Sequence, residues 1–141
     1  MILVDTSAWV EFFRGTSPWG QRVDELLEQN QVALCGPIVT ELRRGLRPAE
    51  RKKVLPLLDG CRWLEQPGSL WEEAGELGML AQSRGTTVKS MDLLIATYAL
   101  AHGVSILTSD SDFLLLERLD VGLVLAPPAP RARTHRRDRR S

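Results

Sequence analysis

Apolar residues are gathered in short blocks along this chain, and polar residues fill the stretches between them. The four clearest blocks are continuously apolar, as is typical of strands buried on both faces of a parallel sheet. They cover residues 1–4, 32–35, 104–107 and 121–125, and we expect all four to be central strands. A weaker block at 62–65 predicts an additional edge strand.

Helix-start signals stand between these blocks. Proline favours the first turn of a helix, and it follows Ser17, follows Gly36 and recurs at position 48. Ser69 has Glu72 three residues later, which is the spacing of a capping box. Strand and helix signals therefore alternate along nearly the whole chain. This alternation predicts a three-layer α/β/α fold with a central parallel sheet.

Residues 90–102 have the most apolar helical pattern in the chain. They leave almost no polar face before Gly103, so we expect a helix that is buried nearly all round. Asp92 lies in the first turn of this helix. It has two interpretations there: an ordinary carboxylate that stabilises the helix N-terminus, or a buried charge that needs a partner.

The length of 141 residues and the hydrophobic fraction of 43% suit one domain with one core. We expect this domain to cover residues 1–126. We expect a disordered tail over 127–141, where three prolines and six arginines occur without a large apolar residue. Without the six arginines and one aspartate of 131–141, the chain has 12 basic and 17 acidic residues, so the domain itself is acidic.

Membrane proteins and disulfide scaffolds are disfavoured classes. No apolar run approaches the roughly 18 residues of a membrane span, and no signal-peptide pattern begins the chain, so we expect a soluble cytoplasmic protein. Cys35 and Cys61 lack the spacing of metal ligands, and we expect both to be reduced core residues.

Carboxylates follow the predicted strands at the edge where α/β sheets place ligand sites. Asp5 follows the first strand, and Asp110 and Asp112 follow a later one. Glu41 lies about one turn into the helix after the second strand, and Asp92 begins the apolar helix. Carboxylates crowded within ~4 Å repel one another by about 4 kcal/mol per pair, so they need a cation, a proton or a basic partner. An all-oxygen site favours Mg²⁺ or Mn²⁺.

Simpler roles stay open for single residues. Asp5 and Asp110 could each cap the helix that follows. His102 lies at a helix C-terminus and His135 lies in the predicted tail, so neither suits general-base chemistry. We expect a structural role for His102.

Four sequence blocks carry a family resemblance: ILVDTSAWVEFF, VTELRRG, SMDLLIATYALAHG and ILTSDSDF. Together they resemble a PIN domain, and more narrowly a VapC-type toxin, in the family's order and at its approximate spacing. The resemblance covers residues 1–126 and leaves only the tail outside.

The resemblance implies a metal-dependent endoribonuclease that uses Mg²⁺ or Mn²⁺ and is the toxin of a type II toxin–antitoxin pair. It also implies a homodimer and a small cognate antitoxin that occupies the active site. The family's catalytic acids fall on Asp5, Glu41, Asp92 and Asp110, of which Asp5, Asp92 and Asp110 would bind the metal. Accessory positions fall on Asp112, Thr6, Ser7 and Thr108. For Thr6 and Ser7, helix capping alone is the simpler alternative.

An acidic pocket repels RNA, so basic residues must hold such a substrate. Arg43, Arg44 and Arg47 begin a basic run that continues through Lys53 and lies close in sequence to Glu41. This run predicts contacts to a phosphate backbone, and its alternative is a solvated helix face. Arg14 and Lys89 are weaker candidates for the same contacts.

The four tryptophans have two interpretations as well. They could stack on RNA bases, but each lies in an apolar periodic segment, which favours core or dimer packing. These residues are Trp9, Trp19, Trp63 and Trp71.

Other functional classes also have acidic residues at one edge of an α/β sheet. A haloacid-dehalogenase-like phosphatase needs an acid two residues after its first aspartate, where this chain has Ser7. A receiver domain needs a late lysine after a strand, whereas only prolines and arginines follow the block at 121–125. Both classes fit poorly. A PIN-like module that binds RNA or protein without cleavage remains the alternative function.

Overall fold

The computed structural model describes residues 1–128 of the chain. Its sheet has four parallel strands in the order β3-β2-β1-β4. The strands are β1 (Ile2–Val4), β2 (Val32–Leu34), β3 (Arg62–Trp63) and β4 (Ser105–Leu107). Leu3 of β1 lies between Ala33 and Ile106 of its two neighbours. The predicted tail lies outside the described residues, except for its first two prolines.

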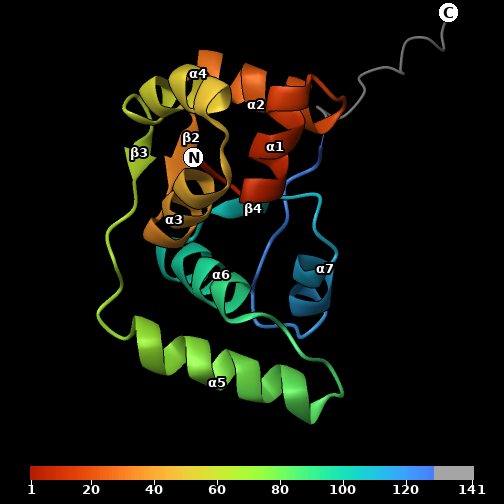
Figure 1. Cartoon of the computed structure of the whole chain (residues 1–141). Coiled ribbons are helices and arrows are strands. Elements are labelled where there is room, and N and C mark those ends of the chain that lie inside the picture. The colour runs from red at the N-terminus through yellow and green to blue at the C-terminus, as the bar shows by residue number, and fades with distance from the viewer. Residues whose placement is uncertain (129–141) are drawn as a thin grey trace, which may run out of the picture.

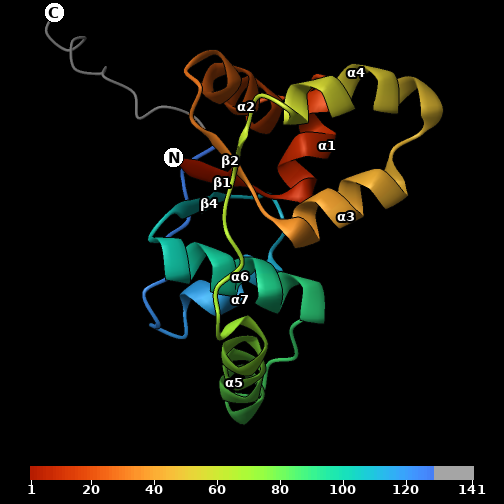
Figure 2. The same ribbon diagram turned by 90° about the vertical axis from the view of Figure 1, so that its left-hand side faces the viewer.

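Helices cover both faces of the sheet, which confirms the predicted three-layer α/β/α fold. Figures 1 and 2 show α1, α2 and α4 on one side of the sheet and α6 and α7 on the other, with α5 packed outside α6. The helices are α1 (Thr6–Arg14), α2 (Trp19–Glu28), α3 (Gly36–Gly45), α4 (Pro48–Leu58), α5 (Leu70–Ser83), α6 (Ser90–His102) and α7 (Asp112–Glu117).

The core lies on both faces of the two inner strands. Leu3 and Leu34 are fully buried, and so are Trp9 from α1 on one side and Ile95 from α6 on the other. The continuous apolar runs of β1 and β2 thus reflect burial from both sides.

Helix α6 has the environment that its apolar pattern predicts. It packs against the sheet and α3 on one side and against α5 on the other, and it ends at Gly103, whose φ of 65° is left-handed. Ala101 and His102 are exposed at its last turn. Asp92 is buried in its first turn.

The predicted central strand at 121–125 is wrong. Only Leu125 pairs with the sheet, through one parallel bridge to Ile106. Asp120 and Gly122 have φ values of 60° and 96°, and left-handed residues interrupt an extended chain. The weak block at 62–65 does form the edge strand β3, although it is only two residues long.

One prediction at a helix start also needs correction. The Ser69 hydroxyl donates to the Glu73 carboxylate, and it does not form a capping box with Glu72. Glu50 provides such a bond at α4, where its side chain accepts from the Arg47 N–H at 2.8 Å. Asp110 does not occupy the N-cap position of α7, which is Ser111, but its Oδ1 accepts from the Asp112 N–H at the start of that helix at 2.9 Å.

Tryptophan and cysteine burial is mixed. Trp9 is fully buried, but Trp63 and Trp71 are 53% and 64% exposed, so core packing is wrong for those two. Cys35 is buried, Cys61 is half-buried, and both are free thiols. No helix within residues 1–128 is long and apolar enough to cross a membrane.

Candidate active site

The candidate site lies where β1 and β4 end. Val4 pairs with Leu107, and the next backbone bond, from the Asp5 N–H to the Leu107 carbonyl, is 2.9 Å long. Parallel pairing therefore places Asp5 beside Thr108 although 103 residues separate them. Strand β2 lies on one side of β1 and β4 on the other, so the site is at a topological switch point, where open α/β sheets bind ligands.

Asp5 is held by two hydroxyl groups. Its Oδ2 accepts from Ser7 Oγ at 2.8 Å and from Thr108 Oγ1 at 2.9 Å. The same oxygen accepts from the Ser7 N–H at 3.4 Å, so Asp5 also caps α1. Burial raises the pKa of Asp5, and the bonds from Ser7 and Thr108 oppose that rise by stabilising the charged form. Asp5 therefore both caps α1 and belongs to the polar site.

The same hydroxyls anchor the loop that follows β4. Ser7 Oγ accepts from the Ser109 N–H at 2.9 Å, and Thr108 Oγ1 accepts from the Asp110 N–H at 3.0 Å. Each hydroxyl thus donates to the Asp5 carboxylate and accepts from the loop backbone. The loop therefore carries Asp110 in a position that depends on Asp5.

Three other carboxylates form the tightest acidic cluster in the described part of the chain. One oxygen from each of Asp92, Asp110 and Asp112 lies within 4.8 Å of the other two. Asp92 is only 5% exposed, and its Oδ2 is buried without a hydrogen-bond partner among residues 1–128. Such an oxygen is costly unless a cation or a proton satisfies it.

The pKa of Asp92 reflects the same cost of burying a charge. Burial, together with the negative charges of Asp110, Asp5 and Asp112, raises the pKa of Asp92 to about 7, and Lys89 opposes the rise. In the metal-free site Asp92 is thus partly protonated near neutral pH. A divalent cation would oppose that protonation by stabilising the charged form.

The donor set suits a hard divalent cation. Three clustered carboxylates, one with an unsatisfied buried oxygen, match the all-oxygen coordination of Mg²⁺ or Mn²⁺. The ligands expected from the sequence are Asp5, Asp92 and Asp110, and the structure brings Asp112 into the cluster with the last two. Asp5 lies close enough to raise the pKa of Asp92. The spacing of Asp110 and Asp112 by two residues around a helix start is the signal that points to this pairing.

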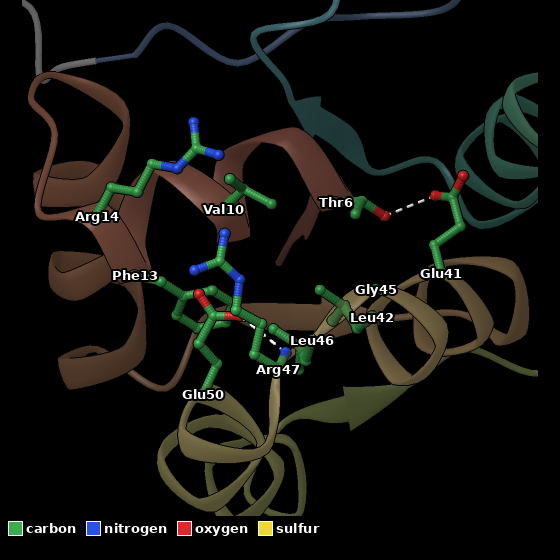
Figure 3. Close-up of a pocket in the computed structure, with 10 residues that line it drawn as sticks. All are labelled: Thr6, Val10, Phe13, Arg14, Glu41, Leu42, Gly45, Leu46, Arg47 and Glu50. Carbon is green, nitrogen blue, oxygen red and sulfur yellow. Dashed lines mark hydrogen bonds between the residues drawn. The ribbon is translucent and has the colours of Figure 1, made fainter.

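Glu41 lies at the side of the site, on α3. Its Oε1 accepts from Thr6 Oγ1 at 2.6 Å, and this bond links α3 to the start of α1 (Figure 3). Thr6 therefore has a contact beyond capping. Because Thr6 directly follows Asp5, the bond joins Glu41 to the carboxylate site.

The remaining candidates lie outside the carboxylate cluster. Arg43, Arg44 and Arg47 are exposed at the end of α3 and the start of α4. Lys89 lies just before α6 and acts on Asp92 through its charge. His102 Nε2 lies 2.8 Å from the Glu65 carbonyl oxygen at the far end of α6, which agrees with a structural role.

This arrangement of fold and acids is that of a PIN domain, whose family model matches residues 2–119, and the chain belongs to this family. Its curated relatives are more specific. VapC ribonuclease Mb1587 of Mycobacterium bovis and Ribonuclease VapC11 of Mycobacterium tuberculosis are each 36% identical over 125 residues, spanning 84% of this chain and 93% of the relative. Within the PIN family, the chain therefore belongs with the VapC ribonucleases.

A solved structure shows the same fold. VapBC2 from Rickettsia felis, bound to a DNA fragment from its promoter, superposes with a TM-score of 0.72 at 21% identity. The match covers 89% of this chain and 98% of the other. The fold described above is thus shared with this VapBC structure over most of the chain.

Proposed function

We propose that this protein is a metal-dependent endoribonuclease that uses Mg²⁺ or Mn²⁺. The observation that carries the proposal is the cluster of Asp92, Asp110 and Asp112, in which one oxygen of each lies within 4.8 Å of the others and the buried Oδ2 of Asp92 has no partner among the described residues. The VapC ribonucleases among its relatives support RNA as the substrate. Asp92 and Asp110 would hold the cation, with Asp5 and Asp112 next to them and Glu41 at the side.

Each polar group has a role in this reaction. When bound, the cation lowers the pKa of a water molecule and offsets charge that develops on the scissile phosphate. Asp5 balances the cation's charge and fixes the hydroxyls of Ser7 and Thr108. These hydroxyls orient the loop that bears Asp110. Glu41, which Thr6 holds at the side of the site, would accept a proton or orient water. The reaction needs no histidine or cysteine nucleophile.

Cleavage of total RNA tests the proposal. We expect the purified protein to cleave RNA with Mg²⁺ or Mn²⁺, to stop when EDTA is added, and to leave 5′-phosphate and 3′-hydroxyl ends. Sequencing of RNA ends after brief expression would identify the target. If a folded protein binds RNA but does not cleave it with either metal, the non-catalytic PIN-like module is the correct function.

We also propose that the protein is the toxin of a type II toxin–antitoxin pair and forms a homodimer. Two observations support this: the VapC relatives, and the VapBC complex whose fold matches over nearly its whole length. The free thiols Cys35 and Cys61 agree with action in the reducing cytoplasm. We expect expression alone to be toxic and a small partner to copurify when the neighbouring gene is included. If cells tolerate high-level expression of the soluble protein alone, the toxin role is contradicted.

A further inference from the structure

A pocket of about 140 Å³ adjoins the carboxylate site on the side of Glu41. It lies between α1 and the connection from α3 to α4 (Figure 3). Thr6 and Glu41 line one end, and Thr6 is the residue after Asp5, so the pocket begins at the edge of the candidate active site. A ligand in this pocket would therefore lie beside Thr6 and Glu41, at the edge of the carboxylate site.

The pocket has an apolar floor and two arginines at its rim. Val10 and Phe13 of α1 and Leu46 after α3 supply the apolar part. Arg14, the last residue of α1, and Arg47, just before α4, extend their guanidinium groups over the same part of the pocket (Figure 3). The two arginines come from opposite walls, so tertiary structure alone brings them together.

The arginines of this pocket differ from its carboxylates in their hydrogen bonds. Within residues 1–128, no hydrogen bond or ion pair engages the guanidinium group of Arg14 or Arg47. The two carboxylates of the pocket already accept bonds, Glu41 from Thr6 and Glu50 from the Arg47 N–H. Neither carboxylate forms an ion pair with either guanidinium group among the described residues, so both arginines keep their donors for an anionic ligand that accepts from both.

We infer that this pocket binds a backbone phosphate of the RNA strand next to the scissile one, with Arg14 and Arg47 as its donors. The inference rests on the proposed ribonuclease function and identifies how that substrate is held. A strand whose scissile phosphate lies at the carboxylates carries another phosphate one nucleotide away, and guanidinium groups bind phosphate with two parallel bonds. The apolar floor accommodates the carbon face of a ribose or a base. The pocket thus supplies the attraction that the acidic site lacks.

Binding of a short single-stranded RNA in EDTA tests this inference without cleavage. We expect Arg14→Gln and Arg47→Gln each to weaken binding about tenfold, as for the loss of a charge-assisted bond. Each should also reduce the slope of log affinity against log salt by about 0.7. The matched control is Arg62→Gln, an exposed arginine on β3 outside the pocket, and we expect less than a twofold effect on affinity. Melting curves of the three variants should coincide with that of the unaltered protein.

A second kind of variant fills the pocket without a change of charge. Gly45 lines the pocket, has no left-handed φ and has open space where a Cβ would lie. We expect Gly45→Leu to fold normally and to lose RNA affinity. If Arg14→Gln, Arg47→Gln and Gly45→Leu bind RNA with unchanged affinity and salt slope, the inference is overturned. If they instead release a copurifying protein partner while RNA binding is unchanged, the pocket is a protein interface.

The outcome is separable from that of the proposed function. A protein that cleaves RNA but shows no effect of these variants remains a ribonuclease that holds its substrate elsewhere. If RNA binding depends on Arg14 and Arg47 but the protein never cleaves RNA, the inference about the pocket is supported and the proposed ribonuclease activity is refuted.

Discussion

The carboxylate site and the arginine pocket are neighbours, yet they hold their charges in opposite ways. Asp5 and Asp92 are 3% and 5% exposed, and their surroundings are hydroxyls, backbone and other acids. Arg14 and Arg47 are exposed and have no side-chain partner among the described residues. Buried charges interact strongly and shift one another's pKa, whereas exposed charges are screened by water and salt. The first region is therefore suited to chemistry, and the second to reversible, salt-dependent binding.

The largest expected effect is on cleavage and comes from the buried acids. Asp92→Asn removes a proposed metal ligand, and we expect RNA cleavage to fall about 10³-fold or more, since a catalytic cation contributes several kcal/mol. Asp5→Asn and Asp110→Asn should act likewise, and Asp112→Asn should be milder. The control is Asp24→Asn on the exposed face of α2, which should retain full activity. Retained cleavage in both Asp5→Asn and Asp92→Asn would refute the assignment.

The pH dependence of stability should follow from Asp92. Its pKa is about 7 in the folded protein and lies near 3.8 when unfolded, so the folded state binds more protons between these values. The metal-free protein should gain up to about 4 kcal/mol from this group as pH falls from above 7 to below 4. Chemical denaturation in EDTA across this range measures the gain. The Asp92→Asn variant should lack this gain in unfolding free energy at low pH. An identical pH profile of the variant and the unaltered protein would contradict the assignment to Asp92.

Thr108→Val tests the hydroxyl that connects the two strand ends. The variant leaves a buried Asp5 oxygen and the Asp110 N–H each short of one partner, which we expect to cost ~1–3 kcal/mol of unfolding free energy and most of the activity. Thr97→Val is the matched control, because that buried hydroxyl only donates to the Leu93 carbonyl within α6. It should cost ~1 kcal/mol or less and spare cleavage. Equal effects of the two variants would show that Thr108 is merely structural.

The smallest expected effect is at the boundary between the two regions. Thr6→Val removes the 2.6 Å bond to Glu41, a half-buried residue that solvent can still reach. We expect unfolding free energy to change by ~1 kcal/mol or less, and cleavage to fall severalfold because Glu41 is no longer held. Thr6→Ser keeps the hydroxyl and should restore activity. Cleavage rates and melting curves of the two variants measure this difference.

Local patterns were sufficient for much of the fold. Strands β1 and β2 are continuous apolar runs because both faces are covered, and α6 is apolar nearly all round because it lies between the sheet and α5. The block at 121–125 shows the limit of this reasoning. Apolar character alone could not reveal that left-handed Asp120 and Gly122 would prevent a strand.

The candidate acids could be named from the sequence, since Asp5, Asp92, Asp110 and Asp112 follow or begin elements that end at one edge of the sheet, and Glu41 lies within α3. The sequence by itself therefore determined the fold class and the family, and it indicated which carboxylates are candidates for the site. Tertiary structure alone decided which groups meet. Asp5 contacts Thr108 across 103 residues, and Arg14 lies over the same pocket as Arg47, because strand pairing and helix packing set those approaches. Contacts between segments distant in sequence depend on how the layers pack, and no local spacing encodes them.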